Sequence, residues 1–162
     1  MNRVVLLTGG NLGDRKRILQ DARKAIEMLI GSVLKASPII QSEAWGFESE
    51  QDFLNQVIVV DTSLSPIEVL NEIQKIEINL DRVRKSEQWV SRLIDIDILF
   101  YNDEIIYSDR LTIPHKHIQD RKFTLYALNQ IMSKYQHPIY KKSIKELLHN
   151  CNDKSKVEVY YA

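Results

Sequence analysis

Hydrophobic and polar positions recur along the chain with regular periods, and these periods predict its strands and helices. Runs rich in β-branched residues predict strands at residues 2–8, 33–45, 53–62 and 94–100. Apolar stripes at helical spacing predict two long helices, one through Ile18, Ala22, Ile26, Leu29 and Ile30 and one through Val69, Ile73, Ile76 and Leu80. Further along, we expect a hairpin or irregular stretch at 103–114, helices at 121–133 and 143–149, and an edge strand at 157–161.

Both long helices carry start signals in the sequence. A glycine-rich turn at residues 9–13 leads to Asp14, whose carboxylate can accept hydrogen bonds from the first turn of a helix. Ser65 and Glu68 form a capping box, with Pro66 at the first helical position. The sequence therefore predicts where each of these helices begins.

The order of the elements predicts the fold class. It runs strand, helix, strand, strand, helix, strand, followed by C-terminal additions. That order fits an α+β fold of the ferredoxin-like, split β-α-β type, in which helices pack on an antiparallel sheet. Because the chain has 162 residues and no linker or repeat, we expect a single domain spanning residues 1–162.

Composition narrows the function classes only a little. Lys and Arg total 22 and Asp and Glu total 22, so the formal net charge is zero, which argues weakly against a dedicated nucleic-acid binder. Cys151 is the single cysteine, which excludes an internal disulfide and a four-cysteine metal site. No apolar run has the length of a signal peptide core or a membrane span, so a cytoplasmic location is expected.

Asp95 and Asp97 are the first candidate chemical site. Side chains alternate along a strand, so both carboxylates lie on one face while Ile94, Ile96 and Ile98 face a core. Two adjacent carboxylates suit Mg²⁺, which prefers oxygen ligands. On spacing alone, an amphipathic strand with one solvated face is the favoured interpretation, but Asp is disfavoured in strands and the flanking cations favour a site.

A basic loop is predicted from Arg82 to Arg92, immediately before the Asp pair. It carries four cations against one carboxylate, and it contains Trp89. Arg binds phosphate well because its planar fork can hold two oxygens at once, so the loop could close over a triphosphate. A solvated loop that binds single-stranded nucleic acid by charge and Trp stacking explains the same residues equally well.

Other motifs are weaker when each is taken alone. His115 and His117 follow a proline, where histidine more often has a structural role. Glu77 lies beside the apolar stripe of the second helix, where a solvated face is the plain explanation. The turn at residues 9–13 lacks the ending of a P-loop and the full dinucleotide fingerprint, so it indicates only a tight strand-to-helix connection.

Taken in order, the motifs resemble those of 6-hydroxymethyl-7,8-dihydropterin pyrophosphokinase, an enzyme family of folate synthesis. The similarity runs from about residue 3 to residue 149. It rests on Phe53-Leu54-Asn55, Glu77, Arg82-Val83-Arg84-Lys85, Trp89, Arg92-x-x-Asp95-x-Asp97, Leu111-Thr112-x-Pro114-His115 and Arg121-x-Phe123. The segments around the two aspartates and around Pro114 are the most specific of these.

The resemblance implies a reaction. Enzymes of the family move the terminal diphosphate of ATP onto the pterin's hydroxymethyl oxygen and release AMP. Asp95 and Asp97 would then hold two Mg²⁺ ions, which agrees with the interpretation from the residues alone. Arg82 and Arg92 would join them as catalytic residues by neutralising charge on the transferred group. A monomer is expected, with no nucleic-acid or membrane partner.

The resemblance also implies two binding sets. The ATP set would comprise Leu70, Gln74, Glu77, Arg84, Lys85, Ile98, Leu111, Thr112, His115 and Arg121. The pterin set would comprise Ser42, Trp45, Gly46, Phe53, Asn55, Trp89 and Phe123. Aromatic faces suit a flat ring, and an Asn amide can both donate to and accept from its edge.

Some positions depart from the family pattern, and two other functions compete with the enzyme. Gly10 stands where the family usually has Ser, Val90-Ser91 replaces a Gly-Pro pair, and Lys116 replaces a frequent aromatic residue. None of these is an expected metal ligand, so they bear on rate and affinity more than on reaction type. The competing functions are a ferredoxin-like RNA-binding module and a family member that has lost activity.

Overall fold

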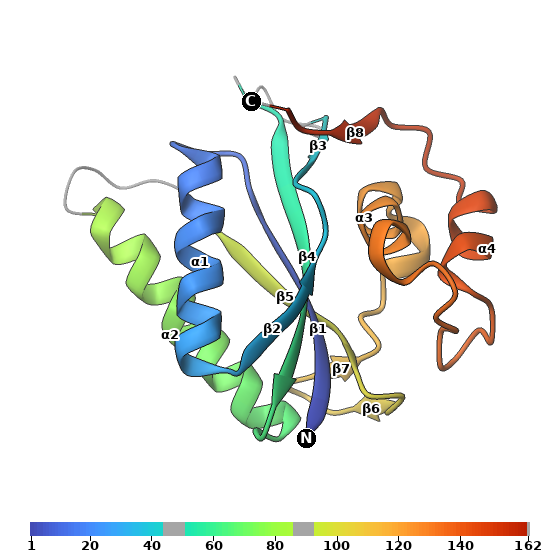
Figure 1. Cartoon of the computed structure of the whole chain (residues 1–162), viewed down its shortest axis with the longest axis horizontal. Helices are drawn as coiled ribbons and strands as arrows, with labels where there is room; N and C mark the ends of the chain where they lie inside the picture. Colours follow the sequence, from blue (N-terminus) through green and yellow to red (C-terminus); the bar gives the residue numbers. More distant parts are fainter. Residues whose placement is uncertain (44–50, 86–92, 162) are drawn as a thin grey trace.

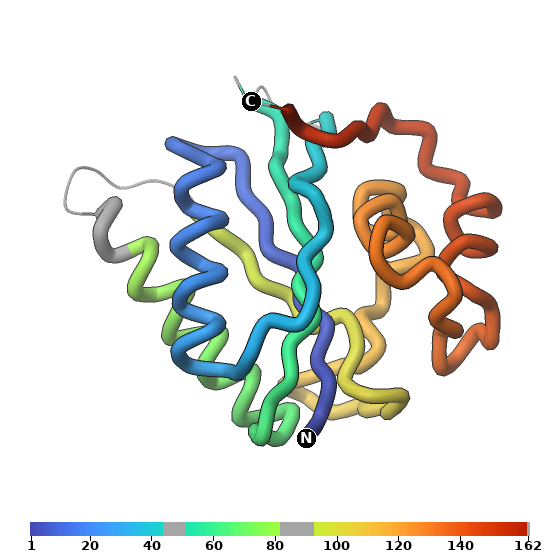
Figure 2. The backbone as a smooth tube through the Cα atoms, viewed as in Figure 1, coloured from blue at the N-terminus to red at the C-terminus, as the bar shows by residue number. Residues whose placement is uncertain are grey.

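A computed structural model describes the chain at residues 1–43, 51–85 and 93–161, and for residues 82–85 it describes the backbone alone. The described elements form three layers, in which a central sheet has helices on both faces (Figure 1). The backbone trace passes back and forth between these layers along the sequence (Figure 2).

Strand β1 (Asn2–Gly10) lies in the middle of the main sheet. It pairs antiparallel with β4 (Phe53–Thr62) on one side and with β5 (Asp95–Tyr101) on the other. Within the described residues the sheet has six strands, in the order β5-β1-β4-β3-β8, where β3 is Ile40–Ser42 and β8 is Val157–Val159. Strand β2 (Ser32–Ala36) also pairs with β4. The antiparallel pairing and the α+β class agree with the sequence prediction.

The helices bury two separate apolar faces of this sheet. Helices α1 (Arg15–Leu29) and α2 (Pro66–Lys85) cover one face, where their predicted stripes pack on residues such as Leu6 and Ile58. Helices α3 (Lys122–Met132) and α4 (Ile144–His149) cover the other. β1 is therefore buried on both faces, which explains its nearly continuous apolar sequence.

A bulge in β5 changes which face its later residues occupy. Val5 pairs with Phe100 and Leu6 pairs with Ile98, so Leu99 is an extra residue in the ladder. Leu99 and Phe100 both join the core under α3 and α4 as a result. Before the bulge the alternation is regular, and the predicted isoleucines of this strand are buried under α1 and α2.

The predicted strand at 33–45 is wrong as a continuous element. The structure has β2 (Ser32–Ala36) and β3 (Ile40–Ser42), and residues 44 and 45 lie outside the described residues. Between the two strands, the Ser37 hydroxyl accepts the Val57 N–H at 3.0 Å and donates to the Pro38 carbonyl at 2.8 Å. The proline has no N–H to continue the ladder, so the chain bends there.

The remaining elements agree with the prediction, with one exception. Short strands β6 (Ile106–Tyr107) and β7 (Thr112–Ile113) pair in the predicted hairpin region, η1 (Ile118–Asp120) precedes α3, and β8 (Val157–Val159) is the predicted edge strand. The exception is residues 82–85, which belong to α2 and not to a loop. Among the described helices, none is long and apolar enough to cross a bilayer.

His137 is a buried titratable group in the layer of α3 and α4. Its ring is 1% exposed and lies 5.7 Å from the Phe100 ring, edge to face. The Nδ1 atom accepts backbone N–H groups of Ile139 and Tyr140 at 3.1 and 3.3 Å. Burial lowers the pKa of the imidazole to about 4. The neutral ring is therefore the form that fits the fold.

We expect the free energy of unfolding to fall as the pH drops from about 6.5 to about 4. In that range the unfolded chain binds a proton at His137 and the folded chain does not. The loss is up to about 3 kcal/mol, at 1.36 kcal/mol for each unit of pKa shift. Urea unfolding at a series of pH values measures it.

The variant His137→Asn keeps an acceptor for the two backbone N–H groups but does not titrate. It should lose this part of the pH dependence, whereas replacing the exposed His149 in the same way should not. An equal pH dependence in wild type and His137→Asn would contradict the assignment.

Candidate active site

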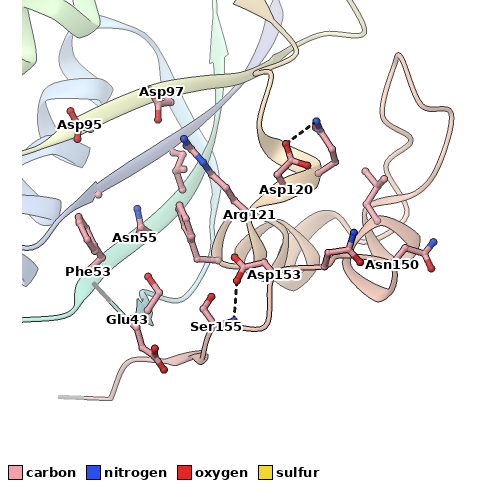
Figure 3. Close-up of a pocket in the computed structure, with 17 residues that line it drawn as sticks. Glu43, Phe53, Asn55, Asp95, Asp97, Asp120, Arg121, Asn150, Asp153 and Ser155 are labelled. Carbon is pink, nitrogen blue, oxygen red and sulfur yellow. Dashed lines mark hydrogen bonds between the residues drawn. The ribbon is translucent and has the colours of Figure 1, made fainter. Parts of the chain in front are cut away.

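A cavity of 840 Å³ opens between the sheet and the layer of α3 and α4 (Figure 3). Its walls come from β1, β4 and β5, from the start of α3, and from the segment after α4. The predicted site residues on its walls are Ser42, Phe53, Asn55, Asp95, Asp97, Arg121 and Phe123. The structure thus brings together residues that are up to 81 positions apart in the sequence, from Ser42 to Phe123.

Asp95 and Asp97 lie on the cavity side of β5. The register places Gly9 of β1 opposite Asp95 and Leu7 opposite Asp97. Asp95 is exposed and Asp97 is half-buried, while the alternating isoleucines pack on the other face. The predicted division of this strand into a carboxylate face and a core face is confirmed.

Gly9 forms the floor between Asp95 and Asn55. It pairs with Asn55 of β4 on one side and with Asp95 on the other. A Cβ atom at Gly9 would collide with the Asn55 side chain. The missing side chain therefore leaves room for Asn55, which is 7% exposed and donates to the Thr8 carbonyl at 3.4 Å. A side chain at Gly9 would separate the amide from the carboxylate.

The aromatic and hydroxyl residues of the predicted pterin set surround this floor. Phe53 begins β4 and Phe123 is the second residue of α3, so they approach the cavity from the sheet and from the opposite helix layer. Ser42 is buried and pairs with Phe53 in the β3–β4 register. A flat ring could lie between the two phenylalanines and meet the Asn55 amide with its edge.

Glu77 of α2 contacts the backbone of β5, and Asp81 contacts the backbone just before this strand. The Ile96 N–H donates to the Glu77 carboxylate at 2.9 Å, and the Leu93 N–H donates to the Asp81 carboxylate at 2.7 Å. The two acids are four residues apart, on one side of the helix. Glu77 thus contacts the backbone directly between Asp95 and Asp97, so the plain explanation of a solvated helix face is wrong for it.

His115 and Arg121 lie near Asp97. The His115 N–H donates to the Leu99 carbonyl at 3.0 Å, which fixes the histidine beside β5. Burial lowers the pKa of the His115 imidazole, and the Asp97 carboxylate acts in the opposite direction. Figure 3 shows Arg121 extending from the start of α3 toward Asp97. Two groups that can donate to phosphate oxygens therefore flank the carboxylates.

Five other residues of the predicted ATP set do not line the cavity. Leu70 and Leu111 pack on the core under α1 and α2, Ile98 is part of that core, and Thr112 lies in β7. Gln74 is exposed on α2. Arg110 donates to the Asn71 side chain at 2.7 Å, which joins α2 to the loop before β7. The structure therefore separates these residues from the predicted pterin set, whose described members line the cavity.

Several predicted residues cannot be placed. Trp45, Gly46, Trp89 and Arg92 lie outside the described residues. The backbones of Arg82, Arg84 and Lys85 lie in the last turn of α2, and their side chains are not among the described ones. The roles predicted for all seven remain predictions.

The sequence analysis missed one wall of the cavity entirely. Leu147, Asn150, Asn152, Asp153 and Ser155 line it from α4 and the segment that follows. Glu43, Gln119 and Asp120 line it as well. No periodicity or motif marks these residues, because only the return of the chain to β3 brings them beside the sheet.

Similarity to known proteins identifies the family once this geometry is known. The family model for 7,8-dihydro-6-hydroxymethylpterin-pyrophosphokinase (HPPK) matches residues 5–133. The chain belongs to the HPPK family. This membership confirms the pyrophosphokinase activity in folate biosynthesis that the motifs predicted, and it favours the enzyme over the RNA-binding module.

Curated relatives support the same assignment. The 2-amino-4-hydroxy-6-hydroxymethyldihydropteridine pyrophosphokinase of Aquifex aeolicus (strain VF5) is 40% identical over 146 residues, which cover 90% of each chain. The enzyme of the same name from Haemophilus influenzae is 38% identical over 126 residues, which cover 77% of this chain and 78% of the relative.

A solved structure supports the fold. The crystal structure of wild-type Plasmodium falciparum HPPK-DHPS with SDX-DHP has a TM-score of 0.74 with 20% identity. The match covers 92% of this chain and 43% of the other, so this chain spans less than half of that protein. At this identity the similarity concerns the fold alone.

We expect Glu77→Leu to destabilise the protein by about 1–3 kcal/mol, because the Ile96 N–H would lose its acceptor. Glu77→Gln keeps a carbonyl oxygen at the same place and should cost less. Urea unfolding measures both. Asn79→Leu, at an exposed position of the same helix, is the matched control. Equal stability of Glu77→Leu and Asn79→Leu would show that the contact is unimportant.

Proposed function

We propose that this chain transfers the diphosphate of ATP to the hydroxymethyl oxygen of 6-hydroxymethyl-7,8-dihydropterin, and that AMP is released. The pterin would occupy the described cavity, and the triphosphate would lie across Asp95 and Asp97. One observation carries the proposal: the two carboxylates of β5 face the same cavity as Phe53, Asn55 and Phe123. Family membership supplies the reaction class.

The cavity suits a bicyclic ring. Its 840 Å³ falls within the range of roughly 300–1,000 Å³ that small-molecule sites occupy. Phe53 and Phe123 would stack on the two ring faces, and Asn55 would bond to its polar edge. Ser42 would contact the same polar edge of the ring, and Trp45, Gly46 and Trp89 would complete the walls around the pterin. The hydroxymethyl group would then point toward β5.

Asp95 and Asp97 fit a pair of Mg²⁺ ions. Two oxygen donors on one face, with space in front of them, are what Mg²⁺ uses when substrate phosphates supply further ligands. When bound, the ions neutralise phosphate charge and stabilise both the entering and the leaving oxygen. The part that the two aspartates play is to fix where the triphosphate lies.

The cationic residues would orient and neutralise the phosphates. His115 and Arg121, which flank Asp97, would hold ATP phosphate oxygens. Arg82 and Arg92 would neutralise charge on the transferred group, with Arg84 and Lys85 assisting them. Positioning and charge neutralisation provide most of the catalysis in phosphoryl-type transfer, so no covalent intermediate on the protein is needed.

The nucleoside would lie on the outer side of β5. Leu70 and Gln74 of α2, Ile98 of β5, and Leu111 and Thr112 near β7 would line its pocket, and three of them, Leu70, Ile98 and Leu111, belong to one apolar cluster. In this arrangement Glu77 would lie beside the ATP, and its carboxylate also holds the β5 backbone at Ile96. ATP and pterin would therefore approach the aspartates from opposite sides.

We expect AMP and the diphosphorylated pterin in equal amounts when the chain is supplied with ATP, the pterin alcohol and Mg²⁺. Diphosphate transfer breaks the bond between the α- and β-phosphates, whereas transfer of one phosphate would leave ADP. Separation of the nucleotides by ion-exchange chromatography distinguishes the two. Formation of ADP alone, or of no nucleotide product, would overturn the proposal.

We expect Asp97→Asn to fold normally and to lower kcat by about 100-fold or more, the scale for removal of one transition-state electrostatic contact. Circular dichroism checks the fold and the AMP assay checks the rate. Asp109→Asn, at an exposed position after β6, is the matched control and should keep full activity. Wild-type activity in Asp97→Asn would contradict a catalytic role and would favour the simpler interpretation of an amphipathic strand with one solvated face.

A further inference from the structure

The segment from Asn150 to Val159, here called the C-terminal segment, closes one side of the cavity. It runs from the end of α4 back to β3 at the edge of the main sheet (Figures 1 and 2). Asn150, Asn152, Asp153 and Ser155 lie on the cavity wall. The match to the family model ends at residue 133, before this segment begins.

The far end of the C-terminal segment is fixed to a strand that carries a site residue. At its far end β8 pairs with β3, with Val157 opposite Ser42. The next residue, Tyr160, donates its N–H to the Ile39 carbonyl at 2.8 Å, and its ring lies 5.6 Å from the Arg15 guanidinium. The segment is therefore a structured part of the fold and not a loose tail.

Asp153 connects the middle of the C-terminal segment to the start of α3. Its carboxylate accepts the Lys122 backbone N–H at 3.0 Å and the Ser155 N–H at 2.9 Å. The Lys122 ammonium donates to the Ser155 carbonyl at 3.2 Å, which closes a small network. Two of these bonds join segments that lie 31 and 33 residues apart in the sequence, and the third stabilises the turn from Asp153 to Ser155.

Helix α3 needs an acceptor from elsewhere at its N-terminus. The residue at its N-cap position is Arg121, whose side chain makes no capping hydrogen bond. The first N–H groups of a helix have no partner within it, and a negative charge beside them is favourable. Asp153 supplies both the acceptor and the charge. Burial alone would raise the pKa of Asp153, but the bonds from Ser155 and Lys122 outweigh it and lower the pKa.

This cap is located between two residues of the proposed site. Lys122, whose N–H it accepts, stands directly between Arg121 and Phe123 in the sequence, and both neighbours line the cavity. Arg121 has extended backbone angles, φ −116° and ψ 108°, whereas the helix begins at Lys122. The junction at which the chain changes conformation is therefore the point that Asp153 fixes.

We propose that the C-terminal segment is a wall of the substrate site, and that Asp153 is a positioning residue which holds Arg121 and Phe123 toward the substrates by capping α3. The inference rests on the proposed function for the roles of Arg121 and Phe123. It adds to that function a part of the chain to which the motifs assign no role.

The first test replaces Asp153. In Asp153→Ala we expect the KM values for pterin and for ATP to rise about fivefold or more, the scale of a lost helix cap, with a smaller change in kcat. Asp153→Asn keeps one acceptor, so its KM values should lie between those of Asp153→Ala and wild type. Lys154→Ala, at an exposed neighbouring position off the cavity wall, should behave as wild type.

The values of KM and kcat distinguish a positioning role of Asp153 from a purely stabilising one. If Asp153 only stabilised the fold, its loss would lower the fraction of active protein and hence the apparent kcat, and both KM values would stay the same. Unchanged KM values in folded Asp153→Ala would overturn the inference. The dissociation constant of the pterin, measured by equilibrium binding, compares wild type with Asp153→Ala without turnover. Failure of the wild-type chain to form AMP would therefore count against the proposed function and not against this inference.

A second variant tests the cap itself and covers a failure of Asp153→Ala to fold. Lys122→Pro removes the N–H that Asp153 accepts, and proline is well tolerated at the first position of a helix. The extended angles of Arg121 are those that a residue before proline prefers. In the Lys122→Pro background, Asp153→Ala or Asp153→Asn should raise the pterin dissociation constant less than in wild type. If the pterin dissociation constant rose as much in the Lys122→Pro background as in wild type, Asp153 would not act through the cap.

A third variant tests the wall. Asn152→Trp introduces a large ring at a position that lines the cavity, whereas Lys154→Trp introduces it two residues away and outside the lining. We expect only Asn152→Trp to weaken pterin binding, by about tenfold, a change of 1.4 kcal/mol. Equal binding by the two Trp variants would contradict the assignment of this segment to the site.

Discussion

The pairing of β1 with β4 on one side and β5 on the other is the constraint on which the site depends. Because each register is fixed by burial on both faces, a slip of one residue would turn every side chain of the slipped strand to the wrong face. The correct register places Gly9 between Asn55 and Asp95. The Asn55 amide and the carboxylate pair are therefore neighbours because of the backbone hydrogen bonds of the sheet.

Strand β5 lies at an edge of the main sheet and pairs there with β1. An edge strand has backbone N–H groups that no neighbouring strand accepts, and here Glu77 of α2 accepts the Ile96 N–H of β5, while Asp81 accepts the N–H of Leu93 just before the strand. The same edge is where a nucleotide could approach the aspartates. Helix α2 thus fixes the strand and forms a side of the proposed ATP site at the same time.

The layer of α3 and α4 completes the site from the other face of the sheet. Helix α3 brings Arg121 and Phe123 to the cavity with its first residues, and Asp153 of the C-terminal segment caps that end. The end of the chain then returns to β3, beside Ser42. The cavity of the proposed substrate site is consequently assembled from three parts of the sequence: the strands, the start of α3 and the C-terminal segment.

The sequence by itself determined the fold class, most element positions, the family and the division of β5 into an acidic and an apolar face. These depend on local periodicity and on motifs whose spacing survives in the linear chain. The tertiary structure alone decided the break at Ser37-Pro38, the contact of Glu77 with Ile96, and the wall that includes Asp153. Each of these depends on which distant backbone group a side chain meets, and the chemical identity of Ser, Glu or Asp does not reveal that partner.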